Sequence, residues 1–101
     1  MEQKMLEELC EYAKIDGEDK LAVNLYLAAV ELAEAETGKV FKIENNIPKY
    51  PLYWLAIKMM VAQWYDNRGN GSEKGFSELP MSAQTILNHI ALSSFFEEVK
   101  K

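Results

Sequence analysis

The sequence is poor in the residues that most often carry metal and redox chemistry. It contains one cysteine, Cys10, and one histidine, His89, in 101 residues. A lone cysteine cannot form a disulfide within the chain, and a zinc site needs several cysteine or histidine ligands at short spacing. We interpret Cys10 as a small buried hydrophobe and His89 as a surface or packing histidine. We therefore expect no disulfide, no metal and no cofactor.

Long apolar runs and targeting patterns are also lacking. The most apolar stretch, residues 52–65, is interrupted by Lys58 and Gln63, and it is shorter than the roughly 20 residues that a membrane-spanning helix needs. The first residues show neither the basic start nor the apolar core of a signal peptide. With the single cysteine, these features favour a protein of a reducing cytoplasm that has no membrane partner.

Basic residues are in the minority, with 11 lysines and arginines against 16 aspartates and glutamates. The resulting net charge of -5 is uneven, because residues 1–38 hold ten acids and three lysines, whereas residues 39–101 hold six acids and eight basic residues. The two parts therefore carry -7 and +2. An acidic protein repels the phosphate backbone, so we expect no tight general binding to nucleic acid.

Apolar residues recur at helical spacing in four segments that turn residues separate. We predict helices near residues 3–14, 18–37, 51–66 and 82–90. Gly38 is a suitable C-terminal cap for the second, Pro51 suits the first turn of the third, and Ser82 suits the N-cap of the fourth. The second and third are apolar nearly all round, which requires burial on more than one side. For the connector between them we predict no regular structure beyond a short extended piece.

The stretch 67–78 is polar and rich in glycine, which is typical of a long loop. We therefore predict an all-α protein: a small four-helix, bundle-like domain over residues 1–90, with this loop before the last helix and a C-terminal tail over residues 91–101. The loop holds one large apolar side chain, Phe76, and the tail carries Phe95, Phe96 and Val99 beside four charged residues. We expect both to be disordered or variable in a free subunit, because they bury too little to offset their ordering entropy.

Carboxylates form the one pattern with catalytic potential. Two pairs lie one helical turn apart, Glu8 with Glu11 and Glu31 with Glu34. Paired helices of this kind could hold Mg²⁺, as in all-helical nucleotide pyrophosphohydrolases, but those enzymes usually place an aspartate in the second pair. No nearby basic group is positioned to hold phosphates, so we interpret the glutamates as solvated faces and predict no catalytic activity. A Mg²⁺-dependent pyrophosphohydrolase and a small acidic helical regulatory protein remain the alternatives.

A resemblance rests on the order of motifs from Leu52 to Ile90. An apolar helix closes on Trp64-Tyr65-Asp66-Asn67-Arg68, a loop follows, and then come Leu79-Pro80 and a short helix with Ile86-Leu87. This order resembles the head-tail connector (adaptor) family of long-tailed bacteriophages and prophages, often labelled DNA-packaging proteins. Residues 6–19 and the helix that ends at Thr37-Gly38 are similar to the N-terminal half of that family. The tail departs from it, because Phe95 and Phe96 replace a short basic ending.

The resemblance implies a structural role without an active site. Proteins of that family assemble as a ring of about a dozen subunits beneath the portal of a filled head, carry the tail-completion proteins and let DNA pass loosely through. The implied partners are the chain itself, the portal protein and the tail-completion proteins. The implied location is the host cytoplasm during assembly and then the head-tail junction of the virion.

Apolar surface on the two long helices, the loop and the tail is expected to remain for neighbouring subunits. The candidate interface residues are Tyr26, Trp54, Trp64, Tyr65, Arg68, Phe76, Pro80, Phe95 and Phe96. For three of them a purely structural role stays open, since Trp64 and Tyr65 could fill the core and Arg68 could complement a helix dipole.

Overall fold

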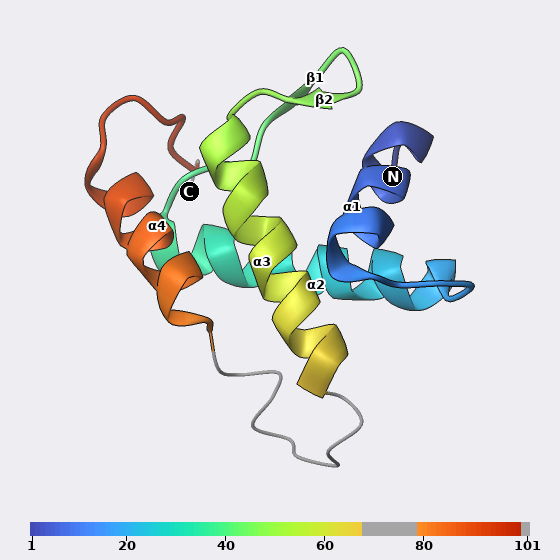
Figure 1. The fold of residues 1–101 in the computed structure, drawn as a ribbon. Coiled ribbons are helices and arrows are strands. Elements are labelled where there is room, and N and C mark those ends of the chain that lie inside the picture. The colour runs from blue at the N-terminus through green and yellow to red at the C-terminus, as the bar shows by residue number, and fades with distance from the viewer. Residues whose placement is uncertain (68–78, 100–101) are drawn as a thin grey trace.

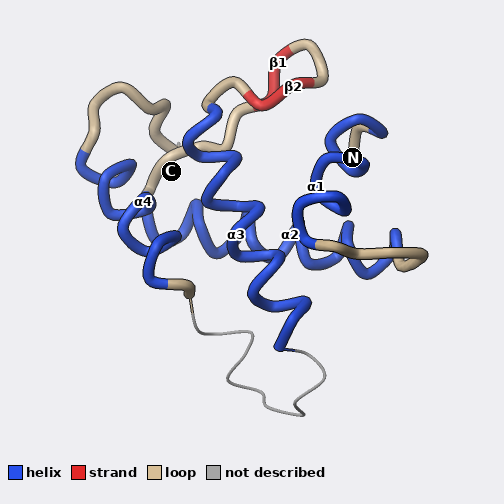
Figure 2. The backbone as a smooth tube through the Cα atoms, in the orientation of Figure 1, coloured by secondary structure: helices blue, strands red, loops and turns tan. Residues whose placement is uncertain are grey.

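The computed structural model describes residues 1–67 and 79–99, which are mainly helical (Figures 1 and 2). Its helices are α1 (Gln3–Ala13), α2 (Asp19–Thr37), α3 (Pro51–Asn67) and α4 (Met81–Leu92). A short antiparallel hairpin of β1 (Ile43–Glu44) and β2 (Ile47–Pro48) joins α2 to α3. The four predicted helices are confirmed, with ends within two residues of those expected. The predicted glycine-rich loop lies, beyond Asn67, outside the described residues.

The helix ends follow local chemistry, with one correction. Gly38 ends α2 in the left-handed conformation (φ 71°), and its N–H donates to the carbonyl of Glu34, as expected of a residue without Cβ. At the start of α4 the N-cap position is Pro80 and not the predicted Ser82. The carbonyl of Pro80 already accepts the N–H of Gln84 at 2.9 Å, so the helix begins one residue earlier than its best capping side chain.

Helix α3 is the centre of the fold and packs against α1, α2 and α4. Figure 1 shows it running across α2, with α1 on one side and α4 on the other. Burial on several sides was predicted for α3 and is confirmed by its buried residues, Tyr53, Trp54, Ala56, Ile57, Met60, Val61 and Trp64. Helix α2 is different: three of its six buried residues are alanines, and it leaves Leu27 and Ala28 exposed.

A buried polar network fixes the chain as it leaves α2. The hydroxyl of Tyr53 donates to the carbonyl of Lys39 at 2.9 Å and lies 3.2 Å from Oγ1 of Thr37. Thr37 in turn donates to the carbonyl of Ala33 at 2.8 Å and accepts the N–H of Lys39 at 3.1 Å. Each buried polar atom in this network thus has a partner, which burial demands. The network holds residues 37–39 against α3.

The connector after α2 is more ordered than predicted. Asn45 and Asn46 both have positive φ, 54° and 63°, and they link strands in which Glu44 faces Ile47. A two-residue hairpin turn of this kind needs positive φ at both central positions, which asparagine tolerates better than most residues. The Asn-Asn pair between Ile43 and Ile47 was therefore a readable hairpin signal.

The C-terminal tail also differs from the prediction. Helix α4 continues to Leu92, and residues 93–99 lie on the fold instead of being disordered. The N–H of Val40 donates to the carbonyl of Glu97 at 2.7 Å, and the N–H of Val99 donates to the carbonyl of Gly38 at 2.9 Å. Phe96 is buried, with 7 % of its surface exposed. The prediction weighed the entropy lost on ordering the tail against too little burial. The buried ring of Phe96 and the two backbone hydrogen bonds offset that entropy.

Candidate functional site

The structure divides the candidate interface residues by exposure. Four are buried in the core: Tyr26, Trp54, Trp64 and Phe96. Two are partly buried, Tyr65 and Pro80, and Phe95 is exposed. The last two, Arg68 and Phe76, lie outside the described residues.

Tyr26 and Trp54 belong to an aromatic cluster inside the domain. The ring of Phe41 stacks on Trp54 with centroids 5.9 Å apart. Tyr26 meets both rings edge-on, 6.2 Å from Phe41 and 6.1 Å from Trp54. Such pairs contribute about 0.5–1.5 kcal/mol each beyond burial, and burial raises the pKa of Tyr26. Phe41, which sequence reasoning left in an irregular connector, is thus a core residue, and its side chain joins the connector to α2 and α3.

Trp64 and Tyr65, which carry much of the resemblance, hold the end of α3 in place. Trp64 is 2 % exposed. The hydroxyl of Tyr65 donates to Oε2 of Glu18, just before α2, at 2.6 Å. A charge-assisted bond of this length is among the stronger hydrogen bonds in proteins. The pair therefore fixes where the chain leaves α3.

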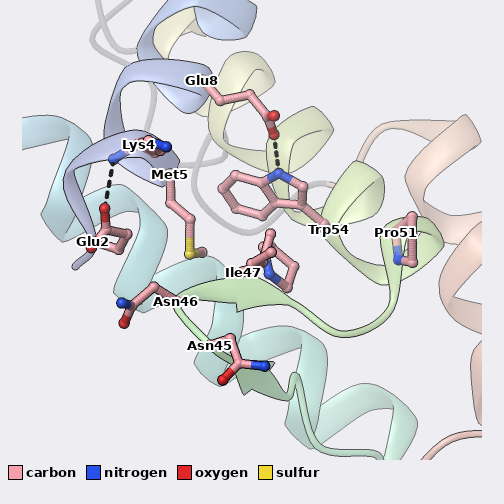
Figure 3. A pocket seen from close by; sticks show the side chains of 10 residues that line it. Glu2, Lys4, Met5, Glu8, Asn45, Asn46, Ile47, Pro51 and Trp54 are labelled. Atoms are coloured by element: carbon pink, nitrogen blue, oxygen red, sulfur yellow. Dashed lines mark hydrogen bonds between the residues drawn. The ribbon is translucent and has the colours of Figure 1, made fainter.

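The carboxylate of Glu8, on α1, binds two side chains of α3; we call these contacts the Glu8 clasp. Glu8 accepts a hydrogen bond from Nε1 of Trp54 (Figure 3) and another from Nζ of Lys58 at 3.2 Å. The ammonium group of Lys58 also lies 5.3 Å from the ring centre of Tyr12 and 5.4 Å from that of Trp54. The bond from Trp54, together with the bond and charge of Lys58, lowers the pKa of Glu8 against a smaller opposing effect of burial. Glu8 is thus a structural acid of this fold.

Next to this clasp lies a groove of about 510 Å³ between the start of α1, the hairpin and the start of α3 (Figure 3). Its side chains are mixed in character: Glu2, Lys4, Met5, Glu8, Asn45, Asn46, Ile47, Pro48, Pro51 and Trp54. The carboxylate of Glu2 accepts the N–H of Lys4 and so caps α1. With two acids and one base on its rim and apolar side chains beneath, the groove has no single chemical character.

The four glutamates of the enzyme alternative are used separately. Glu8 binds α3, as above, and Oε2 of Glu34 accepts the N–H of Phe41 at 2.8 Å. Glu11 and Glu31 are exposed. Within residues 1–67 and 79–99, no three His, Cys, Asp or Glu side chains come together in a way that could hold a metal ion. The described residues thus offer the pyrophosphohydrolase alternative no ligand cluster.

Large exposed apolar side chains gather at the two ends of α4. Met81 is 83 % exposed at its start, and Leu92 is 90 % exposed at its end. Phe95, in the turn that follows, is 74 % exposed, although its ring touches Tyr50 and Phe96. Sequence reasoning found Phe95 but missed Met81 and Leu92. Their positions off the buried stripe of Ala83, Leu87 and Ile90 were the available signal.

Leu92 and Phe95 therefore form an exposed apolar edge at the end of α4, next to a docked C-terminal segment. Within residues 1–67 and 79–99, no helix combines the length and the apolar character needed to cross a membrane. Comparisons with protein-family models, with curated proteins and with solved structures find no match to this chain.

Proposed function

We propose that this chain is a structural head-tail connector subunit of a tailed bacteriophage or prophage, which forms a ring between portal and tail. The observation that carries the proposal is the ordered series of motifs from the apolar helix through Trp64-Tyr65 to Leu79-Pro80 and a short final helix. The four helices, taken as a bundle-like domain, agree with it. The hydrogen bond from Tyr65 to Glu18 supports it further, because it gives a motif residue a structural role: it holds the C-terminal end of α3 against the start of α2.

Exposed apolar side chains support a role in association. Leu92 and Phe95 lie at the end of α4, and Ile47 lies in the hairpin, on a different part of the fold (Figure 1). Head-to-tail rings join two different surfaces of neighbouring copies. A subunit with separate exposed apolar sites is suited to that kind of contact.

The charge distribution supports loose passage of DNA. The residues of α1, α2 and their connection carry -7 within residues 1–38, so these two helices would repel phosphate. Each salt contact with a phosphate adds affinity that does not depend on sequence and would slow movement through a ring. Submicromolar binding of duplex DNA at physiological salt would contradict this part of the proposal.

The proposed partners are further copies of the chain, the portal protein and the tail-completion proteins. The proposed location is the host cytoplasm during assembly and then the head-tail junction. The test is deletion of the gene from the genome that carries it, followed by electron microscopy of the particles. We expect filled heads and separate tails, with joining restored by the wild-type chain. Normal joining without the chain, or its absence from restored particles, would overturn the proposal.

Point variants refine the test. Phe95→Ser, at an exposed ring, is expected to fold and yet to reduce joining. Glu11→Ser, at an exposed polar site of α1, is the control and should join normally. Equal joining by both variants would show that the apolar edge at the end of α4 is not a contact surface.

A further inference from the structure

Residues 96–99 lie against a defined site on the rest of the fold. We call residues 96–99 the C-terminal strap, and residues 38–40 with Tyr50 and Tyr53 the acceptor site. Val40 and Gly38 bind the backbone of the strap through the two bonds given above, and Lys39 faces Glu98 between them in an antiparallel bridge. The acceptor site is thus a short strand edge beside an aromatic surface.

The strap is recognised through a few contacts of distinct kinds. The ring of Phe96 lies 4.7 Å from that of Tyr50 and 6.2 Å from that of Tyr53. Glu98 pairs with Lys39 and Glu97 pairs with Lys42, each at 3.6 Å. An aromatic residue followed by two acids therefore matches an aromatic surface beside two lysines. None of these contacts depends on the strap belonging to the same chain.

The link between the strap and α4 is a tight turn with little holding it. The N–H of Ser93 donates to the carbonyl of Ile90 at 3.2 Å, and the N–H of Phe95 donates to Oγ of Ser93 at 3.1 Å. Leu92 and Phe95, on either side of this turn, stay exposed while the strap sits on its own chain. When the strap binds its own chain, its hydrogen bonds and ion pairs are formed, but Leu92 and Phe95 beside the turn stay exposed to water.

We propose that the strap is exchanged between copies, so that residues 96–99 of one copy occupy the acceptor site of the next. Exchange keeps every contact of the strap and places Leu92 and Phe95 at the boundary between two copies, where they can be covered. Donor and acceptor are different surfaces, so each copy gives one strap and receives one. The role of the exchange in a ring rests on the proposed connector function; the exchange itself does not.

The protein concentration decides whether the strap binds the acceptor site of its own chain or that of another copy. A strap on a short link reaches its own acceptor at an effective concentration on the order of millimolar. A dilute subunit therefore keeps its own strap and stays monomeric. Exchange requires a local concentration of that order, which subunits gathered on a common platform would reach.

Disulfide trapping in purified protein tests the exchange. Lys39 and Glu98 face each other between the two backbone bonds, a position where Cα atoms of antiparallel strands lie about 4.5 Å apart, within disulfide range. In a Cys10→Ser background, Lys39→Cys and Glu98→Cys chains are unfolded together, refolded at roughly millimolar concentration and oxidised. We expect a disulfide-linked heterodimer whose yield falls at least tenfold on hundredfold dilution before oxidation.

Two controls make the result decisive. The double variant, with both cysteines in one chain, should form the intrachain disulfide when dilute, which shows that the chain folds and that the pair can bond. A mixture of Glu44→Cys and Glu98→Cys chains, with Glu44 in the exposed hairpin, measures chance collisions. A heterodimer yield no higher than this background, while the double variant closes fully, would overturn the exchange. The head-tail joining assay would be unaffected by that result, so the two proposals fail separately.

Discussion

Removing a single hydroxyl, by Tyr53→Phe, should weaken the junction that carries the acceptor site. Tyr53 is fully buried, and its hydroxyl bonds the carbonyl of Lys39 and Thr37. Thr37 keeps its bonds to Ala33 and to the N–H of Lys39, so the main loss is the donor to the Lys39 carbonyl. The carbonyl of Lys39 then keeps only a long contact of 3.5 Å with Oγ1 of Thr37, and losing its good donor costs about 1–2 kcal/mol of unfolding free energy.

The same substitution should change how stability depends on pH. Burial raises the pKa of Tyr53 from 10.0 to about 12; the hydrogen bond with Thr37 lowers it by less than burial raises it, and the charge of Glu34 makes the smallest, raising contribution. The folded protein therefore favours the neutral phenol. The stability that follows is fully present below pH 10 and is lost between about pH 10 and 12. One unit above the unfolded pKa the loss is about 1.4 kcal/mol, and the full shift corresponds to roughly 3 kcal/mol.

The assay is urea unfolding of both proteins, followed by circular dichroism at pH 8 and at steps up to about pH 11.5. We expect the wild type to be the more stable by about 1–2 kcal/mol at pH 8, and the difference to vanish near pH 11. Titration of Tyr26, whose pKa burial also raises, is common to both proteins and cancels in the difference. A stability difference that stays constant with pH would refute the assignment of this network to Tyr53.

Three further outcomes are expected. Glu8→Ala should lower the unfolding free energy by up to about 1 kcal/mol at pH 7, because the side chain of Glu8 is 54 % exposed and solvent screens its charge. This cost should shrink in urea titrations as the pH falls towards the lowered pKa of Glu8, because the carboxylate is then protonated in the wild type. Gly38→Ala should cost about 1 kcal/mol or more in thermal unfolding, since φ is 71° at the end of α2, and a neutral effect would contradict the left-handed cap. Purified protein with Mg²⁺ should not hydrolyse nucleoside triphosphates; turnover that disappears in Glu31→Gln would restore the enzyme alternative.

The helices were predictable because their signals are local. Apolar periodicity, a glycine after Thr37 and a proline at residue 51 are read within one or two turns, and the structure follows them closely. The hairpin was missed although Asn45-Asn46 is also a local signal. Two strands of two residues carry too little alternation to stand out, so only the turn chemistry could have revealed them.

The tail could not be predicted because its contacts are distant in sequence. Phe95 and Phe96 are neighbours of the same type, and sequence reasoning treated them alike. The structure separates them, since Phe96 lies under Tyr50 while Phe95 faces solvent. Which of the two rings is buried depends on where residues 38–40 lie relative to the end of α4. That relation is set by the fold of the whole chain, not by the tail.

Core and interface residues share the same chemistry, and this is why the candidate site was only partly predicted. A tryptophan on a helix that is apolar nearly all round fits either role, and burial assigns Trp54 and Trp64 to the core. Trp64 and Tyr65, which carry much of the resemblance, therefore stabilise the fold. Leu92 and Phe95, which are exposed, lie outside the matched motifs. A core motif can be kept while the exposed edge changes its partner. The proposed connector function is therefore best tested at the exposed edge and the strap, because substitutions at Trp64 would affect folding whichever function the protein has.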